Sequence, residues 1–515
     1  MCGIFASLSY NEPELDVLKE NGEKCQHRGP DETKTLYIPN DKKYIYMMFH
    51  RLAINGLNPE SGQPLTINDD SSKLLICNGE IYNYKILAEK YDITLETESD
   101  CEIILHLYNK SCIDFFINEL DGVFSFLIID LNEDKIITGH DPFGIRPLYY
   151  AHDFNETNQR YLFASEMKSL VDLSDNVNFY PPGSFSILDM NTYEMNNYSY
   201  YGFVYPTIME DNEQIIIQNI KSKLTDAVTK RLITDRPLGC LLSGGLDSSI
   251  ITALVCDKLG AENVRTFTIG LEGSPDLYSA QKVAEYLGTN HTNVIVSEKE
   301  MLKAIDLTIY QIESHDTTTI RASTPMYLIS EYIKVNTDIK VILSGEGSDE
   351  ASGSYLYFHN APSPNEFQKE CIRLLKDVRY YDVLRGDKTT AGNGLELRVP
   401  FFDKTFMQYY MGIDPEKKVI RDGMEKYLLR KSFEDMLPEE IVWRRKDGFS
   451  DGVSSFEKPW YEIINEYTKE KFGLTEKEYY QNTFEKYYLG HKDIIPYEWL
   501  PKWSSLKNPS GRLIS

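Results

Sequence analysis

Short hydrophobic runs bounded by polar residues fill the first two-fifths of the chain. The runs "KYIYMMFHRLAI", "KLLICNGEIY", "VFSFLIID" and "KIITGHD" are rich in Tyr, Phe and Ile, and Asn, Asp, Gly or Pro residues bound them. Aromatic and β-branched residues in runs of this length are typical of half-buried strands. The pattern therefore predicts a β-rich region over residues 1–205, which we call the N-terminal half.

The spacing of hydrophobic residues changes near residue 212. Ile216, Ile220, Leu224 and Val228 lie four residues apart, which predicts a helix. Beyond it, "PLGCLLSGG", "VRTFTIGL", "TNVIVS" and "KVILSGEGSDE" are predicted strands, and "DSSIITALVCDKLG" and "DLYSAQKVAEYLG" are predicted helices. Strands that alternate with helices predict a parallel sheet with covered faces. We place this α/β half at residues 206–515, with the boundary inside "SYYGFVYPTIMEDNEQ".

The overall charge limits the kinds of molecule that the protein is expected to bind. The chain has 515 residues, 79 of them acidic and 54 basic, so its net charge is -25. This balance argues against a general nucleic-acid binder, which would show a basic footprint. It leaves room for a nucleotide substrate, because a small basic site can sit in an acidic protein.

The cysteines and the apolar runs indicate the compartment. Eight cysteines are spread along the chain, without a C-x-x-C pair or a Cys/His zinc spacing. The start lacks the layout of a signal peptide, and no run approaches the roughly 18 apolar residues of a membrane helix. We expect a cytoplasmic protein with no membrane partner and with its thiols reduced.

The stretch "LLSGGLDSS" at residues 241–249 carries the clearest chemical signal. A predicted strand ends at Ser243, two glycines follow, and Asp247 opens a predicted helix. Glycines let backbone N–H groups converge, and a helix N-terminus favours phosphate. A plain strand-to-helix turn is the alternative. The string "SGGLDS" resembles the pyrophosphate-binding loop of the PP-loop ATP pyrophosphatases, which cleave ATP between the α and β phosphates.

A second predicted strand ends in "SGEGSDE". In a regular parallel sheet this end lies beside the first loop, where ligands bind. Ser344 and Gly345 could approach the nucleotide, and Glu346, Asp349 and Glu350 bring three carboxylates into one turn. A solvated acidic loop is the alternative. Carboxylates that face a polyphosphate require Mg²⁺ or other cations between them.

Three basic residues downstream are candidates for such cations. They are Lys388, Arg398 in "LELRVPF" and Lys446 in "WRRKDGFSDG". Each one alone could be a surface charge. As a set beside the loop, they could hold a departing pyrophosphate.

The N-terminal half contains a series of motifs. In order they are "CGIF", "QHRGPDE", "FHRLAI", "NGEIYN", "ESDCEII", "HDPFGIRPLYY" and "FASEMKSL". Taken singly, Arg51 could be a surface charge and Asn78-Gly79 a hairpin turn. In this order and spacing the motifs resemble the N-terminal-nucleophile glutaminase of class II amidotransferases. The resemblance implies an α+β half of layered antiparallel sheets with helices.

Cys2 is the expected nucleophile of that glutaminase. Gly3 offers little bulk to block removal of Met1. The α-amine freed on Cys2 would have a pKa of about 7.7–8.0 and could accept the thiol proton near neutral pH.

The resemblance also assigns the glutamine site. It implies that the Asn78 side chain and the Gly79 N–H stabilise the oxyanion formed when the amide is attacked. It implies that Arg51 pairs with the α-carboxylate of glutamine, and that Asp100, with Glu80 alongside, takes its α-ammonium. Leu52 and Ile54 complete the expected glutamine pocket.

The two halves together resemble the glutamine-hydrolysing asparagine synthetases over nearly the whole chain. This implies that ATP converts the β-carboxylate of aspartate to an adenylate, which ammonia attacks after crossing an internal tunnel. AMP and pyrophosphate would leave. The expected ATP-binding residues are Leu241, Ser243, Gly244, Gly245, Asp247, Ser248, Ile269, Asp276, Ser344 and Gly345.

The same resemblance assigns the remaining groups. Asp247 and Asp349 would hold Mg²⁺. Glu346, Lys388, Arg398 and Lys446 would serve the adenylation and amide-forming steps. Glu346, Asp349, Glu350 and Arg398 would contact aspartate or the intermediate. The expected partners are small molecules, namely glutamine, aspartate and ATP, and the sequence leaves room for a homodimer.

Two positions depart from the family pattern. After "SGEGSDE" the chain reads Ala351-Ser352-Gly353-Ser354 where an apolar or aromatic residue and Gly-Gly are usual, and His140 stands where arginine is common. Two other functions stay open: a related synthetase that acts on another carboxylate, and a non-catalytic nucleotide or glutamine sensor.

Overall fold

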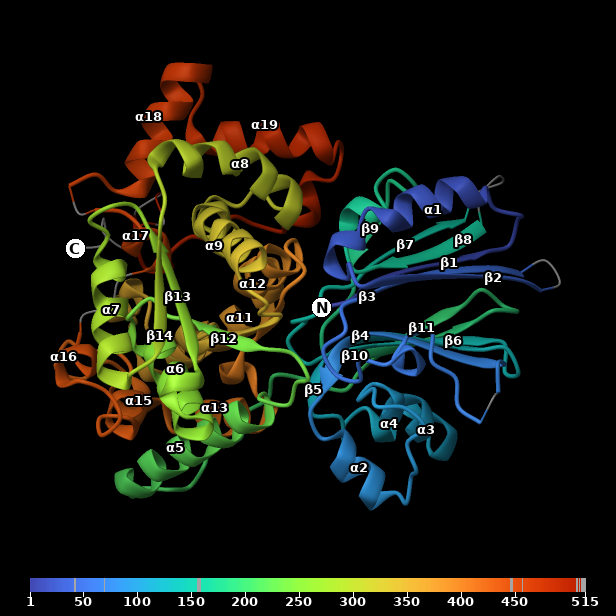
Figure 1. Ribbon diagram of the computed structural model, residues 1–515, viewed down its shortest axis with the longest axis horizontal. Helices are drawn as coiled ribbons and strands as arrows, with labels where there is room; N and C mark the ends of the chain where they lie inside the picture. The colour runs from blue at the N-terminus through green and yellow to red at the C-terminus, as the bar shows by residue number, and fades with distance from the viewer. Residues whose placement is uncertain are drawn as a thin grey trace.

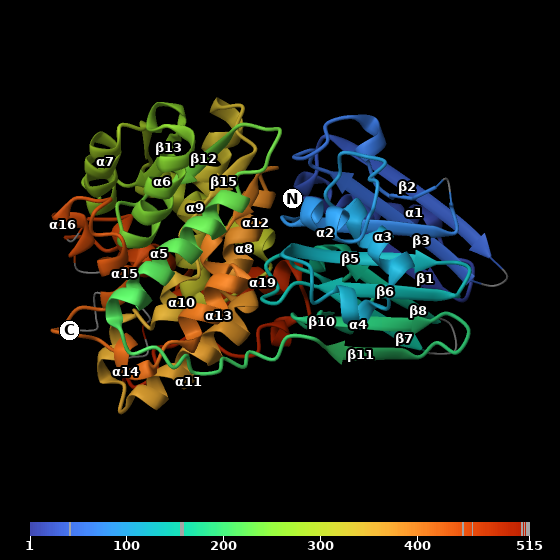
Figure 2. The ribbon, with the colours of Figure 1, turned by 90° about the horizontal axis from the view of Figure 1, so that it is seen from below.

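Two halves of the chain lie side by side in the computed structural model, and the N-terminus lies between them (Figures 1 and 2). The structure describes residues 1–510 except 41–42, 69, 155–158, 445–447, 456, 506–507 and 509. Within these residues, no helix combines the length and the apolar character needed to cross a membrane.

Two stacked antiparallel sheets form the N-terminal half. The first has the strand order β2-β3-β1-β8-β7-β9 and the second the order β11-β10-β6-β5-β4. The strands are β1 Gly3–Ser9, β2 Glu32–Asn40, β3 Lys43–Arg51, β4 Lys73–Ile81, β5 Gly122–Asp130, β6 Lys135–His140, β7 Tyr149–Phe154, β8 Gln159–Ala164, β9 Val177–Phe179, β10 Ser184–Asp189 and β11 Met195–Ser199. The β-rich prediction is confirmed.

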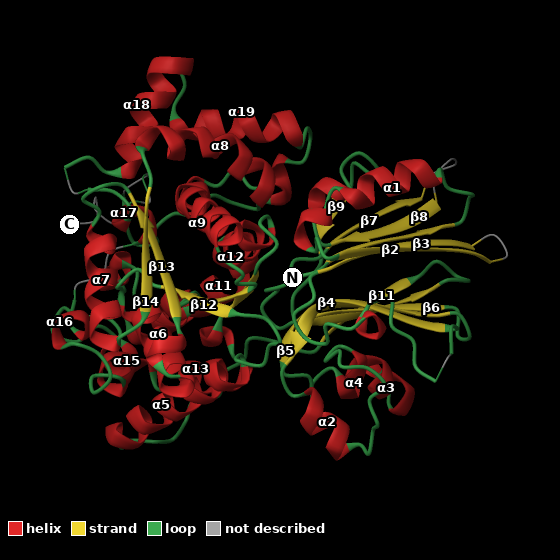
Figure 3. Cartoon of the chain, in the orientation of Figure 1, coloured by secondary structure: helices red, strands yellow, loops and turns green. Residues whose placement is uncertain are grey.

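The core of this half lies between the two sheets. Ile4 of β1 and Phe163 of β8 pack in one buried cluster with Ile76 of β4 and Leu127 of β5. Helix α1 (Leu15–Glu23) covers the outer face of the first sheet, and helices α2 (Tyr84–Lys90), α3 (Glu102–Lys110) and α4 (Ile113–Phe116) cover that of the second (Figure 3). Strand β1 begins, and strand β4 ends, close to the C-terminal half: Met1 packs in a cluster shared with that half, and Glu80 lies 3.5 Å from Arg398.

A parallel five-stranded sheet organises the C-terminal half, as the alternating pattern predicts. Its order is β14-β13-β12-β15-β16, with β12 Leu238–Leu241, β13 Arg265–Gly270, β14 Asn290–Ile295, β15 Val341–Leu343 and β16 Glu396–Arg398. The chain adds strands on one side of β12 and then on the other. Such a reversal leaves a crevice at the carboxyl ends of the strands, where ligands bind in sheets of this kind.

Helices surround this sheet. They are α5 Glu213–Lys230, α6 Leu246–Leu259, α7 Pro275–Leu287, α8 Glu298–Ile312, α9 Thr317–Asn336, α10 Ser348–Ser352, α11 Pro364–Asp377, α12 Asp382–Ala391, α13 Lys404–Gly412, α14 Pro415–Lys418, α15 Tyr427–Ser432, α16 Glu439–Val442, α17 Phe449–Gly452, α18 Trp460–Phe472 and α19 Glu476–Tyr487. Ile216, Ile220, Leu224 and Val228 are all buried on α5, as their spacing predicts.

The two halves share an apolar core. One buried cluster contains Met1, Val123 and Phe143 together with Leu397 and Phe402 from the other half. The rings of Phe143 and Phe402 lie 5.3 Å apart. The first residues of the chain are thus enclosed between the halves.

Candidate active sites

Cys2 immediately precedes β1 and follows Met1, which packs in the apolar cluster shared with the C-terminal half. Its Sγ is 3.8 Å from the backbone oxygen of Leu52, and burial raises the pKa of the thiol to about 11. The amine of Met1 is also buried, lies 3.6 Å from Glu396 Oε2, and has its pKa lowered by burial. A thiol in this state is protonated at neutral pH and is a poor nucleophile.

Asn78 on β4 is fully buried, and its side chain has no hydrogen-bond partner among the described residues. Neither Oδ1 nor Nδ2 is paired, and the hydroxyl of Ser125, directly opposite on β5, is unpaired too. An unsatisfied buried amide costs about 1–3 kcal/mol. A ligand oxygen that accepts from Nδ2 would remove that cost, so this side chain suits an oxyanion.

Gly79 follows Asn78, and the strand pairing leaves no room for a side chain there. A Cβ at this position would overlap the backbone oxygen of Val123 and lie 2.6 Å from the Phe124 Cα. The glycine keeps the β4 backbone close to β5 next to the unpaired Asn78 amide.

Arg51 and Asp100 lie in the same region of the N-terminal half. Arg51 donates to the backbone oxygen of Gly56, and its Nη1 is 3.5 Å from Glu32 Oε2. Asp100 accepts a 2.6 Å hydrogen bond from Ile81 N at the end of β4, and burial raises the pKa of its carboxyl to about 6.

Glu80 and its neighbours border the C-terminal half. Asn55 donates to Glu80, and Arg398 Nη2 lies 3.5 Å from the same carboxylate. Burial, with Asp100 nearby, raises the pKa of Glu80. Leu52 and Ile54 are buried in a small cluster with Val341 of β15.

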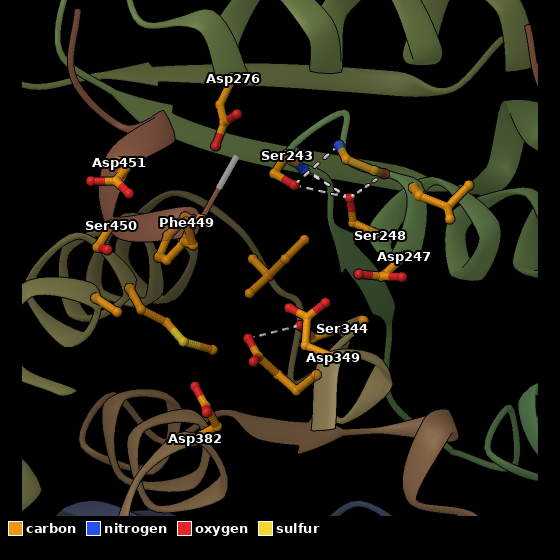
Figure 4. Close-up of a pocket in the computed structure, with 18 of the residues that line it drawn as sticks. Ser243, Asp247, Ser248, Asp276, Ser344, Asp349, Asp382, Phe449, Ser450 and Asp451 are labelled. Carbon is orange, nitrogen blue, oxygen red and sulfur yellow. Dashed lines mark hydrogen bonds between the residues drawn. The ribbon is translucent and has the colours of Figure 1, made fainter. Parts of the chain in front are cut away.

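A cavity of about 1060 Å³ opens at the carboxyl ends of β12, β13 and β15 (Figure 4). The structure brings most of the predicted nucleotide and aspartate residues to this cavity. They are Leu241, Ser243, Gly245, Asp247, Ser248, Ile269, Asp276, Ser344, Gly345, Glu346, Asp349 and Glu350. Within this predicted set, Leu241 and Glu350 are 109 positions apart in the chain, yet both line the cavity. The cavity lies where the reversal in strand order predicts a ligand site.

The loop between β12 and α6 is held by its own hydroxyl groups. Ser243 N donates to Ser248 Oγ at 3.2 Å, and the two hydroxyl oxygens lie 3.1 Å apart. Gly244 has a φ of +70°, and a Cβ there would overlap the backbone of Ser279. A Cβ on Gly345 would lie 2.8 Å from Ser248 N. The two predicted loops are therefore in close contact, and the N-terminus of α6 faces the cavity, as phosphate binding requires.

Lys426 joins the two carboxylates that the sequence assigns to Mg²⁺. Its Nζ lies 2.5 Å from Asp247 Oδ2 and 2.5 Å from Asp349 Oδ1, and its side chain is 2% exposed. Both aspartates thus reach one shared cation, and carboxylate oxygens are ligands that Mg²⁺ prefers. No cluster of three or more His, Cys, Asp or Glu side chains with metal-ligand geometry occurs among the described residues.

A second network lines the cavity from α12. Arg385 Nη2 lies 2.5 Å from Glu346 Oε2 and 2.7 Å from Asp382 Oδ1. Tyr355 donates a 2.6 Å hydrogen bond to Glu350, whose pKa is raised by burial and by nearby carboxylates. In Figure 4, Asp276, Asp349 and Asp382 reach the cavity from different elements.

Sequence reasoning missed Lys426, Arg385 and Asp382. Asp382 and Arg385 carry opposite charges and lie three residues apart, a spacing that brings side chains together on a helix. This spacing was the one sequence signal that could have indicated the pair. Nothing in the sequence around Lys426 marks it, because its importance comes from two aspartates that lie 179 and 77 positions away.

Of the three predicted cations, the two that the structure describes, Lys388 and Arg398, do not line the cavity. Lys388 is fully buried, binds Glu313 and lies 2.9 Å from the hydroxyl of Tyr149 in the other half. Arg398 donates to Glu396 at 2.8 Å and to the backbone oxygen of Arg231 at 2.7 Å. Both residues lie between the halves, where they pair with buried carboxylates or carbonyl groups. Lys446 lies outside the described residues.

The two departures from the family pattern have local explanations. Gly353 keeps a φ of +59° at the end of α10, and Ser354 donates to Asp349. His140 places Nε2 2.8 Å from the backbone oxygen of Arg146 and Nδ1 3.2 Å from that of Pro181.

Comparisons with known proteins cover the whole chain. The glutamine amidotransferase domain model matches residues 1–202, and the asparagine synthase model matches residues 219–370 and 361–506. Asparagine synthetases [glutamine-hydrolyzing] from Cricetulus griseus and Homo sapiens are each 40% identical over 561 aligned positions, which cover 100% of this chain and 99% of each relative.

One solved structure with a partial likeness is that of the allosteric regulatory enzyme of purine biosynthesis. It is 16% identical, covers 57% of this chain and 80% of its own, and has a TM-score of 0.35. With the family matches over both halves and the full-length relatives, the chain belongs to the asparagine synthase family and carries an N-terminal glutamine amidotransferase domain.

Proposed function

We propose that this protein makes L-asparagine from L-aspartate, with ATP as the energy source and glutamine as the nitrogen donor. The observation that carries the proposal is that one chain holds both a buried, unpaired Asn78 amide in the N-terminal half and a cavity built on the "SGGLDS" loop in the C-terminal half. We assign residues 1–205 to a glutaminase domain and residues 206–515 to a synthetase domain.

In the glutaminase domain, Cys2 attacks the side-chain amide of glutamine after Met1 has been removed. The new α-amine lies on the same residue as the thiol and takes its proton. Asn78 Nδ2 and the Gly79 N–H donate to the oxyanion. Arg51 binds the α-carboxylate and Asp100 the α-ammonium of glutamine. Ammonia leaves, and water releases glutamate from the thioester.

In the synthetase domain, the β-carboxylate of aspartate attacks the α-phosphate of ATP. The products of this step are β-aspartyl-AMP and pyrophosphate, and attack by ammonia then gives asparagine and AMP. Ser243, Gly244 and Gly245 cradle the phosphates, with the N-terminus of α6 behind them. Asp247 and Asp349 would hold Mg²⁺, which supplies positive charge to the polyphosphate.

Lys426 bridges Asp247 and Asp349 at this end of the cavity. We assign it to the polyphosphate, in place of Lys388 and Arg398. Lys446 remains a sequence-based candidate for the departing pyrophosphate. Glu346 and Glu350 face the aspartate side, where Arg385 and Tyr355 hold them in position.

We further propose a cytoplasmic location, because the described cysteines are all free and a reducing compartment keeps them so. A homodimer remains an expectation from the sequence. The alternative of another carboxylate substrate has no structural observation in its favour.

Product identification tests the proposal. The purified protein is supplied with aspartate, glutamine, ATP and Mg²⁺, and the products are separated by chromatography. We expect asparagine, glutamate, AMP and pyrophosphate in equal amounts. ADP and orthophosphate as the stoichiometric products would exclude the adenylate. An amide of another acid, formed when aspartate is replaced, would favour the alternative substrate.

A further inference from the structure

Arg28, in the "QHRGPDE" motif, holds the backbone of Cys2. Its Nε donates a 3.0 Å hydrogen bond to the carbonyl oxygen of Cys2, and the side chain is fully buried. This carbonyl is bonded to the Cα that carries the thiol. Arg28 therefore fixes the position of the Cys2 main chain, from which the thiol side chain extends.

Two carboxylates in turn fix that guanidinium, and they come from different halves of the chain. Nη1 donates to Glu166 Oε1 at 3.0 Å, within the N-terminal half. Nη2 donates to Asp387 Oδ2 at 2.8 Å, across the boundary. A planar guanidinium with all three nitrogens bonded has no freedom to rotate.

Asp387 is itself anchored on α12 of the synthetase half. It is 1% exposed, and its Oδ1 lies 3.4 Å from Arg146 Nη1. Arg146 also donates to the backbone oxygen of Leu397 at 3.0 Å. One carboxylate thus serves two arginines of the glutaminase half, which its isosteric amide could not do, because an amide NH₂ would face one of them.

We propose that Asp387 is a positioning residue of the glutaminase: the synthetase half supplies the carboxylate that orients Arg28, and through it Cys2. The glutaminase site is complete only when α12 is docked. This inference rests on the proposed role of Cys2 as nucleophile. It does not involve the glutamine pocket, because the contacts of Arg51 and Asp100 lie elsewhere.

The test compares Asp387→Asn with Glu313→Gln in the full-length protein. Glu313 is an equally buried carboxylate of the synthetase half that binds Lys388 and the backbone N of Met167 and Lys168, without contact to Arg28. Both variants remove one buried charge at the same interface. Thermal unfolding and asparagine formation from ammonia report on folding and on the synthetase half.

For Asp387→Asn we expect the glutaminase kcat to fall about tenfold, because displacements below 1 Å at a nucleophile are costly. The KM for glutamine should stay within about twofold, since its charged groups bind elsewhere. Labelling of Cys2 by a diazoketone analogue of glutamine should slow in parallel. Glu313→Gln should lower the unfolding midpoint and leave the glutaminase kcat unchanged.

A double-mutant cycle with Arg28→Lys decides whether Asp387 acts through Arg28. If it does, Asp387→Asn has no further effect on kcat in the Arg28→Lys background. Additive losses, an unchanged kcat in Asp387→Asn, or an equal loss in Glu313→Gln would each overturn the inference. Cys2→Ala serves as the reference: residual glutaminase in that variant would overturn the proposed function instead.

Discussion

Burial decides the protonation of the groups that surround the first residues of the chain. The Cys2 thiol has its pKa raised to about 11, and the Met1 amine is held inside the molecule near Glu396. A protonated thiol reacts slowly, so Cys2 needs a nearby base before it can act as the proposed nucleophile. Cleavage would put an amine directly on Cys2.

We expect the mature chain to be one methionine lighter by intact-mass analysis. Cys2→Ala should abolish glutaminase activity and leave synthesis from free ammonia intact, because the proposed ATP cavity lies in the other half. Cys112→Ala, at an exposed cysteine, is the control and should keep both activities. Glutamine-dependent synthesis that survives in Cys2→Ala would assign the nucleophile to another residue.

Asp100 should make glutamine use depend on pH. Burial raises the pKa of Asp100 to about 6, so the carboxylate that we propose binds the α-ammonium of glutamine becomes protonated as the pH falls through 6. The KM for glutamine should then rise. Asp100→Asn should raise the KM for glutamine about ten- to a hundredfold at pH 8, because this factor corresponds to the loss of one hydrogen bond to a charged group. Asp316→Asn, at a carboxyl whose pKa burial also raises to about 6, should leave the KM unchanged.

The same burial gives Asp100 an effect on stability with a defined sign. The folded protein holds the Asp100 proton more tightly than the unfolded chain does, so the ionised form is unfavourable to folding above pH 6. Asp100→Asn should therefore raise the free energy of unfolding at pH 8 by about 2–3 kcal/mol. The gain should shrink between pH 6 and pH 4, measured by unfolding at each pH. A gain that is the same at pH 4 and pH 8 would contradict this assignment.

At the scale of elements, β12, the glycine loop that follows it and α6 together form the proposed phosphate-binding unit. The strand is buried, the loop curls back through Ser243 and Ser248, and the helix N-terminus faces the cavity. Gly244 is the point at which this path needs a left-handed backbone next to Ser279. The loop therefore tolerates no side chain there.

Gly244→Ala should abolish asparagine formation from either nitrogen donor, because a Cβ would push the loop away from the backbone of Ser279. Glutaminase activity should remain. Gly273→Ala is the matched control, since Gly273 has a φ of +79° and open space around its Cα. It incurs the same backbone cost, roughly 1–2 kcal/mol, without the collision. Equal losses in the two variants would mean that backbone strain alone is responsible.

At the scale of the whole molecule, the halves are joined by much more than the chain that connects them. Residues 200–212 contain no helix or strand, and Met209 is 96% exposed. Elsewhere the halves share an apolar cluster, a 2.8 Å ion pair between Arg28 and Asp387, and a 2.9 Å hydrogen bond from Arg236 Nε to Ala53 O.

Cutting the connection should therefore leave the molecule whole. A protease site placed at Met209 and cleaved in the folded protein should give two fragments that elute together in size-exclusion chromatography. Glutamine-dependent synthesis should persist, because the interface and not the connecting segment aligns the two sites. The uncleaved engineered protein is the control. Fragments that separate in dilute buffer would show that the connection is required.

The sequence by itself determined the features that depend on neighbouring residues. Hydrophobic spacing distinguished the two halves, and the "SGGLDS" string and the order of N-terminal motifs indicated the phosphate loop and Cys2. These features are local, because a strand, a glycine turn and a helix N-terminus are specified within about ten residues. Most of the predicted ATP residues accordingly line one cavity.

Only the tertiary structure decided which charges meet. Lys426 bridges Asp247 and Asp349. Lys388 and Arg398 instead pair with the carboxylates of Glu313 and Glu396 between the halves. The physical reason is that a basic residue has the same local appearance whether it faces a phosphate, a buried carboxylate or water. Its partner is fixed by packing between segments that lie far apart in the chain, and the pairing of Arg28 with Asp387, 359 positions away, is of this kind.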